Sequence, residues 1–95
     1  MAFLFTLKNM SWDIESFVEK LESNHDFPGS YTFKFIVEAE HQSKVVELIE
    51  GADVKLKPSS GNKYVSVTLI AHMPTSQHVV DIYIRAKKIE GIISL

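Results

Sequence analysis

The sequence contains no cysteine, which excludes a disulfide framework, a thiolate nucleophile and a cysteine-ligated zinc or iron–sulfur site. Its four glycines and three prolines are too few for a low-complexity or fibrous chain. A net charge of −2 provides no broad basic field that would attract nucleic acid or an anionic membrane. The apolar runs are short, far below the ~20 residues needed to cross a bilayer. A chain of 95 residues with this composition is predicted to form one globular core.

The first ten residues, MAFLFTLKNM, are apolar but do not form a targeting signal. They lack the basic start and the small-residue cleavage site of a secretory signal peptide, so we expect a cytoplasmic protein. The turn-forming stretch SNHDFPGS, residues 23–30, is the best candidate boundary in the chain. It separates an expected N-terminal extension, residues 1–27, from an expected folded domain, residues 28–95.

Within the extension, apolar residues recur at helical spacing. Ser11 is placed to cap the first turn. This pattern predicts an amphipathic helix from Trp12 to Leu21, with one apolar stripe along its length. The stripe consists of Ile14, Phe17, Val18 and Leu21.

After the boundary, the apolar pattern changes to the alternation of β-strands. Residues 31–38, 53–57 and 64–72 are each predicted to form a strand with one buried face. The inward-facing residues are expected to be Tyr31, Phe33, Phe35, Val37, Val54, Leu56, Val65, Val67, Leu69 and Ala71. Residues 92–95, IISL, are predicted to form a short last strand.

Two further segments have helical spacing. Val45, Val46, Leu48 and Ile49 predict a helix that ends at Gly51, where a glycine can adopt a positive φ. A second helix is predicted from Ser76, its expected N-cap, to Gly91. Its stripe consists of Val79, Ile82, Tyr83, Ala86 and Ile89.

The predicted order β-α-β-β-α-β, preceded by an N-terminal helix, indicates an α+β fold. Two crossover units in one chain give a four-stranded antiparallel sheet with both helices on one face. This is the ferredoxin-like split βαβ architecture, with an expected strand order of 4-1-3-2.

The stretch KPSSGNKYVSV, residues 57–67, raises the question of a phosphate-binding loop. Such a loop needs glycines and a following helix whose N-terminal amides face the phosphate. Here a strand follows instead. We expect a hairpin turn in which Gly61 has a positive φ, and in which local hydrogen bonds come from the serines. The expected turn residues are Pro58, Ser59, Ser60 and Gly61.

This same stretch carries a family resemblance. The segments FPGSYTFKFIV and VKLKPSSGNKYVSVTL, followed by an "IY" helix and an "EGI" end, resemble the YbeD-like family of small bacterial proteins of unknown function. The resemblance covers roughly residues 21–95, and the Lys-Pro-Ser-Ser-Gly run is its most specific part. It implies a ferredoxin-like fold similar to ACT-like regulatory domains, and a regulatory or protein-interaction role without a settled activity.

The sequence offers no catalytic constellation or metal motif. His25, His41, His72 and His78 lack metal-ligand spacing, although His72 and His78 could approach each other, with Glu38 nearby. The serines lack a nucleophile elbow. The loop of residues 37–44 has no glycine and two glutamates, so the usual ligand site of ACT domains is expected to be absent. We expect no cofactor and no enzymatic activity.

The sheet face opposite the helices is the most informative surface. It is expected to carry a local basic patch that could bind an acidic partner or a small anion. Single-stranded nucleic acid is the other alternative for this face, although the aromatic residues of the first strand are expected to point into the core, which makes it less favoured. The candidate partner or ligand face consists of Lys34, Lys55, Lys57, Lys63, Tyr64 and Ser66.

The N-terminal extension also needs a partner for its apolar residues, which include Phe3, Leu4 and Phe5. It could fold back on the edge or the open face of its own sheet, or pack against another subunit. We expect a homodimer through Ile36, Ile70 and Tyr64 of the open face, together with an unidentified protein partner.

Overall fold

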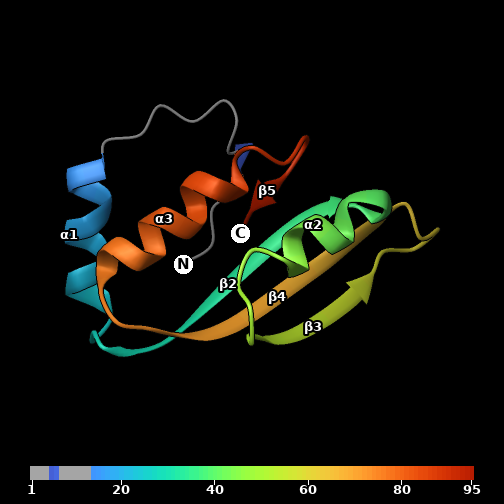
Figure 1. The fold of residues 1–95 in the computed structure, drawn as a ribbon. Coiled ribbons are helices and arrows are strands. Elements are labelled where there is room, and N and C mark those ends of the chain that lie inside the picture. The colour runs from blue at the N-terminus through green and yellow to red at the C-terminus, as the bar shows by residue number, and fades with distance from the viewer. Residues whose placement is uncertain (1–4, 7–13) are drawn as a thin grey trace.

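A computed structural model describes residues 5–6 and 14–95 of the chain (Figure 1). Ser11, Trp12, Phe3 and Leu4 lie outside the described residues. The elements are β1 (Phe5–Thr6), α1 (Ile14–Asn24), β2 (Gly29–Glu38), the 3-10 helix η2 (Ala39–His41), α2 (Gln42–Val46), β3 (Asp53–Pro58), β4 (Tyr64–Met73), α3 (Ser76–Ala86) and β5 (Ile93–Ser94).

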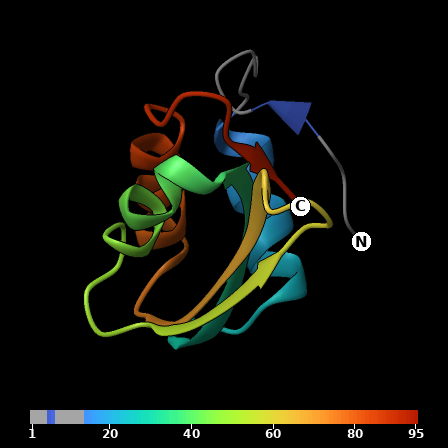
Figure 2. The same ribbon diagram turned by 90° about the vertical axis from the view of Figure 1, so that its right-hand side faces the viewer.

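The strands form one antiparallel sheet in the order β1-β5-β2-β4-β3. Figure 2 shows α2 and α3 together on one side of β2, β4 and β3. The predicted ferredoxin-like α+β fold is confirmed, because β5, β2, β4 and β3 have the expected order 4-1-3-2. The additional strand β1 pairs with β5, so part of the N-terminal extension folds back on the edge of its own sheet.

The core lies between the sheet and its helices. Alternate residues of β2 and β4 point toward the helices, and their register places Phe33 opposite Leu69 and Phe35 opposite Val67. The predicted inward faces of these two strands are therefore confirmed. The largest fully buried side chains are Phe33, Phe35, Leu69, Ile92, Val37, Val45, Val65, Val67, Val79 and Val80.

Tyr83 of α3 joins several elements at the centre of this core. Its ring centroid lies 5.4 Å from that of Phe33 and 5.7 Å from that of Phe35. The Tyr83 phenol lies close to the side chains of Tyr31 and Ser94, which both influence its pKa. Burial raises the pKa of Tyr83 well above its ordinary value, so the phenol stays neutral and can be buried with its polar end satisfied.

The helix α1 packs against the hydrophobic core of the same chain. Leu21 is buried, and the Phe17 ring meets the Tyr83 ring edge-on with a centroid distance of 5.5 Å. Val18 packs partly against the core, whereas Ile14 at the start of the helix is 42% exposed. Among the described residues, no helix is long and apolar enough to cross a membrane.

The predicted burial of Val54 and Leu56 is wrong. Both side chains of β3 point to the helix side of the sheet, because they pair with Leu69 and Val67, yet they are 39% and 45% exposed. The physical reason is that β3 is the edge strand and α2 is only 5 residues long. The helical layer ends before it covers β3.

Both central helices are shorter than predicted. The helix α2 ends at Val46, so Leu48 lies in the following turn, where its carbonyl accepts a hydrogen bond from the Arg85 guanidinium. The helix α3 ends at Ala86, well before Gly91, because residues 87–92 form a separate turn with Gly91 at φ +72°.

The cap of α3 also differs from the prediction by one residue. Thr75 is the N-cap, and its Oγ1 accepts from the backbone N–H of His78 at 3.3 Å. Ser76, the expected cap, is the first helical residue. Its hydroxyl donates instead to the Glu22 carboxylate of α1.

The strand register can be tested by comparing two neighbouring residues of β2. Phe35→Ala should lower the free energy of unfolding by about 3–5 kcal/mol, because it leaves a cavity between the sheet and α3. Lys34→Ala should change the free energy of unfolding by less than about 0.5 kcal/mol, because the Lys34 side chain is exposed on the other face. Chemical denaturation measures both. The reverse order of effects would contradict the register.

Candidate interaction surface

The serine-glycine segment forms the turn between β3 and β4. The Ser59 N–H donates to the Tyr64 carbonyl at 2.8 Å, and the Tyr64 N–H donates to the Ser59 hydroxyl at 3.1 Å. Gly61 has φ +85°, and Asn62 follows with φ +58°. The N–H groups of Ser59 and Tyr64 therefore hydrogen-bond within the turn. No helix begins after it, since β4 starts at Tyr64, so the segment has no cradle for a phosphate.

The open sheet face lies opposite α2 and α3, and three of its lysines come from two strands. Lys34 of β2 and Lys55 of β3 flank Thr68 of β4, because both residues pair with it. The spacing of neighbouring strands places the two lysine Cα atoms about 10 Å apart. In the next row, Lys57 lies beside Ser66. The structure thus brings these predicted residues together on one surface.

Among the described residues, the lysines of this face, here called the lysine face, form no ion pair, although Glu38 and Asp53 lie on the same face of the sheet. No carboxylate in residues 5–6 and 14–95 lies within salt-bridge distance of Lys34, Lys55 or Lys57. The Lys63 ammonium lies 5.5 Å from the centroid of the Tyr64 ring, a cation–π arrangement at the hairpin end of the face. An acidic group bound here would therefore meet ammonium groups that have no competing partner.

The half-buried residues between the lysines add hydroxyl groups and apolar surface to this face. Thr68 and Ser66 present hydroxyl groups in the middle strand, and Ile36 and Ile70 present apolar surface beside them. Tyr64, which is 40% exposed, pairs with Glu38 of β2. The face therefore offers charge, hydrogen bonds and modest apolar area together, as protein interfaces do.

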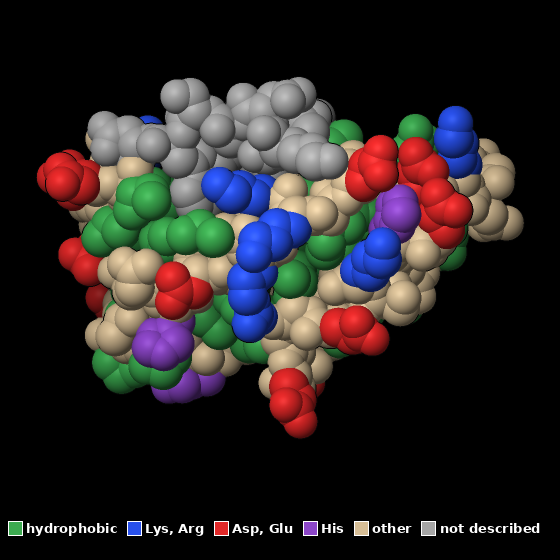
Figure 3. Space-filling view, turned by 45° about the horizontal axis from the view of Figure 1, so that its top comes forward, with side chains coloured by type: hydrophobic (Ala, Val, Ile, Leu, Met, Phe, Trp, Pro, Cys, Tyr) green, Lys and Arg blue, Asp and Glu red, His purple; other side chains and the backbone are tan. Residues whose placement is uncertain are grey.

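The helix side of the molecule carries basic residues in a different setting. Figure 3 shows Lys and Arg side chains gathered in the middle of this side. Arg85, Lys87 and Lys88 lie at the end of α3 and in the turn that follows it. Arg85 is engaged in the fold, because its guanidinium donates to the Leu48 carbonyl. Lys87 and Lys88 are exposed and serve as a matched reference for the lysine face.

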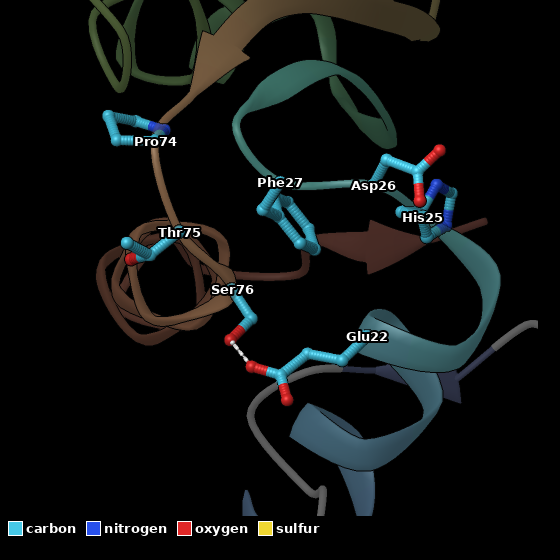
Figure 4. Close-up of a pocket in the computed structure, with 7 residues that line it drawn as sticks. All are labelled: Glu22, His25, Asp26, Phe27, Pro74, Thr75 and Ser76. Atoms are coloured by element: carbon cyan, nitrogen blue, oxygen red, sulfur yellow. Dashed lines mark hydrogen bonds between the residues drawn. The ribbon is translucent and has the colours of Figure 1, made fainter.

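A surface hollow of about 430 Å³ lies where α1 meets the start of α3 (Figure 4). In Figure 4, the Ser76 hydroxyl points toward Glu22, to which it donates at 2.6 Å. Thr75 is engaged as the N-cap of α3, with Oγ1 2.8 Å from Nδ1 of His78. The hollow is lined by Glu22, His25, Asp26, Phe27, Pro74, Thr75 and Ser76.

These contacts indicate that the residues around the hollow hold α1 against the start of α3. The Glu22 carboxylate is placed near the positive end of the α3 dipole, which its hydrogen bond with Ser76 exploits. His25 packs edge-on against Tyr31 with ring centroids 4.9 Å apart. The sequence interpretation missed this hollow, because its lining comes from two segments far apart in the sequence, the end of α1 with the turn after it and the start of α3 with the turn before it, and no local pattern links them.

The four histidines do not form a site. His72 pairs with Ser30 at one end of β4, whereas Glu38 pairs with Tyr64 at the other end. The suggested approach of Glu38 to His72 is therefore wrong. His41 lies 3.6 Å from the Glu40 carboxylate at the surface. In residues 5–6 and 14–95, no group of three potential ligands is placed to hold a metal ion.

Comparisons with known proteins add one finding. The model of the family described as "Protein of unknown function (DUF493)" matches residues 22–95, which include everything from the end of α1 to β5. Neither a curated protein nor a solved structure matches the chain.

The turn can be tested at Gly61. Gly61→Val should lower the free energy of unfolding by about 1–3 kcal/mol, because a β-branched residue is strained at a positive φ. A Cβ there would meet open space, so any loss comes from the backbone conformation and not from a clash. Asn62→Gly is the matched control, and it should stay within about 1 kcal/mol of the wild type.

Thermal unfolding with added nucleotide tests whether this turn binds a phosphate-containing ligand. A saturable rise in melting temperature on adding nucleotide would contradict the assignment of residues 57–64 as a turn without a phosphate site.

Proposed function

Because the chain belongs to the DUF493 family of proteins of unknown function, its role must be argued from its surfaces, and we propose a non-enzymatic protein-interaction module with a regulatory role. The proposed partner is a protein segment rich in Asp and Glu. The resemblance to YbeD-like proteins and to ACT-like regulatory domains supports a role of this kind, as does the expected cytoplasmic location.

The observation that carries the proposal is the lysine face. Lys34, Lys55 and Lys57 project from adjacent rows of a rigid sheet, and none has a carboxylate partner among the described residues. Ser66 and Thr68 lie between them and can donate hydrogen bonds. A face with this composition fits a polypeptide that brings carboxylates to the ammonium groups.

An enzymatic role finds less support in the described residues. The serines of the turn hydrogen-bond within the turn, and the carboxylate of Glu22 in the hollow accepts from Ser76. These groups are not paired with a histidine, and Thr75, whose Oγ1 lies 2.8 Å from Nδ1 of His78, is engaged as the N-cap of α3.

The lysine face also favours a second candidate function, which is binding of a small anion or of single-stranded nucleic acid. The exposed ring of Tyr64 could stack on a base, and the lysines could contact phosphates. Against this, Phe33 and Phe35 of the central strand β2 point into the core, so among the described residues Tyr64 alone presents an aromatic ring on the face. An acidic protein partner is therefore the better fit.

The proposal predicts that charge reversal on this face abolishes partner capture. The double variant Lys34→Glu/Lys57→Glu should lose a protein that the wild type captures from its source cell, as measured by affinity capture and mass spectrometry. The control Lys87→Glu/Lys88→Glu makes the same charge change on the helix side and should retain that protein. If both variants capture the same proteins as the wild type, the lysine face is not the binding surface.

Salt dependence separates the two candidate functions. Binding of a single-stranded oligothymidylate should be weak or absent, whereas a nucleic-acid-binding face would give saturable binding that falls steeply as salt rises. If the wild type bound the oligothymidylate in this salt-sensitive way and Lys34→Glu/Lys57→Glu did not, the second candidate function would be favoured over the first.

A further inference from the structure

The outer edge of β3 is a second surface that the proposed function does not use. Within the part of the chain that the structure describes, β3 pairs with β4 on one side and ends the sheet on the other. All six residues of β3 are exposed. Such an edge presents backbone groups that can add a further strand.

The hydrogen bonds of the neighbouring strands show which backbone groups of β3 point outward. Ser59 bonds through its N–H to Tyr64, which makes this a hydrogen-bonded pair of the β3–β4 ladder. Because such pairs alternate along an antiparallel ladder, the N–H and C=O groups of Lys57, Lys55 and Asp53 also point toward β4. Those of Val54 and Leu56 point outward.

The part of this edge whose backbone groups can bond to a further strand is short. Pro58, the next residue with an outward position, has no N–H to offer. Val54 and Leu56 provide the outward backbone groups, and their side chains also expose apolar surface beside the edge. A partner strand would therefore bond to residues 54–56 and cover these two side chains.

The charge pattern of β3 makes this edge complementary to itself. Asp53 and Lys55 lie on the same face of the strand, two residues apart, with opposite charges. If two copies pair antiparallel about a two-fold axis at Val54, each Asp53 lies opposite the Lys55 of the second copy. The outward groups of the two Val54 residues then bond to each other.

Other registers are less favourable. An axis at Lys55 pairs each Asp53 with Lys57 of the other copy, but it also places the two Lys55 side chains directly opposite each other, and like charges in that position are destabilising. An axis at Leu56 places Lys55 opposite Lys57 and sets Val54 against Pro58, which cannot donate. Only the axis at Val54 pairs opposite charges without a repulsive pair in residues 53–56.

We propose that two copies of this chain associate through their β3 edges, antiparallel, with Asp53 of each copy opposite Lys55 of the other. The self-complementary charges identify a second copy as the occupant of the edge. The dimer joins two sheets into one, and it places the two lysine faces side by side on the same surface. A short ladder of this kind gives a weak, concentration-dependent dimer.

Charge reversal in single and double variants tests the register. Sedimentation equilibrium of the full chain should show dimers that populate as concentration rises to about 1 mM. Asp53→Lys and Lys55→Asp should each weaken association about tenfold or more, because each places like charges opposite each other twice. The double variant Asp53→Lys/Lys55→Asp should restore association, since it swaps the two partners.

Val54→Pro provides an independent test of the edge. It removes an outward N–H that the β4 ladder does not use, so the variant should melt like the wild type and remain monomeric. Lys87→Glu is the control with a charge change away from the edge, and it should dimerise normally.

Four outcomes would overturn the proposal. The first is a wild type that is monomeric at all concentrations up to about 1 mM. The second is a dimer that neither single charge reversal weakens, and the third is a double variant that associates no better than the single variants. A folded Val54→Pro variant that still dimerises would likewise exclude the β3 edge.

Discussion

The contact of Tyr83 with the aromatic face of β2 is the interaction on which the rest of the structure depends. Its ring lies against Phe33 and Phe35, the Phe17 ring of α1 meets it edge-on, and its phenol lies close to Ser94 of β5. One buried side chain therefore holds α3, α1, β2 and β5 together. Truncating it would leave a cavity where these elements meet, and large-to-small changes in a core are costly.

This packing determines what remains for the surface. Because β2 directs its aromatic rings inward, its other face presents Lys34 and Thr32. The same alternation in β4 leaves Ser66 and Thr68 on that face, between the lysines of β2 and β3. The open face is thus polar and basic as a consequence of the core, with little aromatic surface for stacking on bases.

The sequence pattern predicted the central strands well and the edge poorly, for physical reasons. Alternation over ten residues in β2 and β4 admits one register, because a slip by one position would expose Phe33 and Phe35. In β3 the same alternation only indicates which side Val54 faces, and whether a helix reaches that side depends on the length of α2. The Thr75 cap and the hollow beside Ser76 depend on how α1 packs against α3. No local sequence pattern indicates this packing. The lysine face followed directly from the register, since its residues are the complement of the core positions.

The two proposed surfaces share β3 and compete only for the Lys55 side chain. The side chains of Lys55 and Lys57 belong to the open face, whereas the outward backbone groups belong to Val54 and Leu56, because side-chain direction and hydrogen-bond direction alternate together along a strand. In the β3 dimer, Lys55 would be engaged by Asp53 of the second copy, and Lys34 and Lys57 would remain available. Association would then bring two such lysine pairs onto one continuous surface, so that a single acidic chain could contact both and gain affinity without any new contact within either copy.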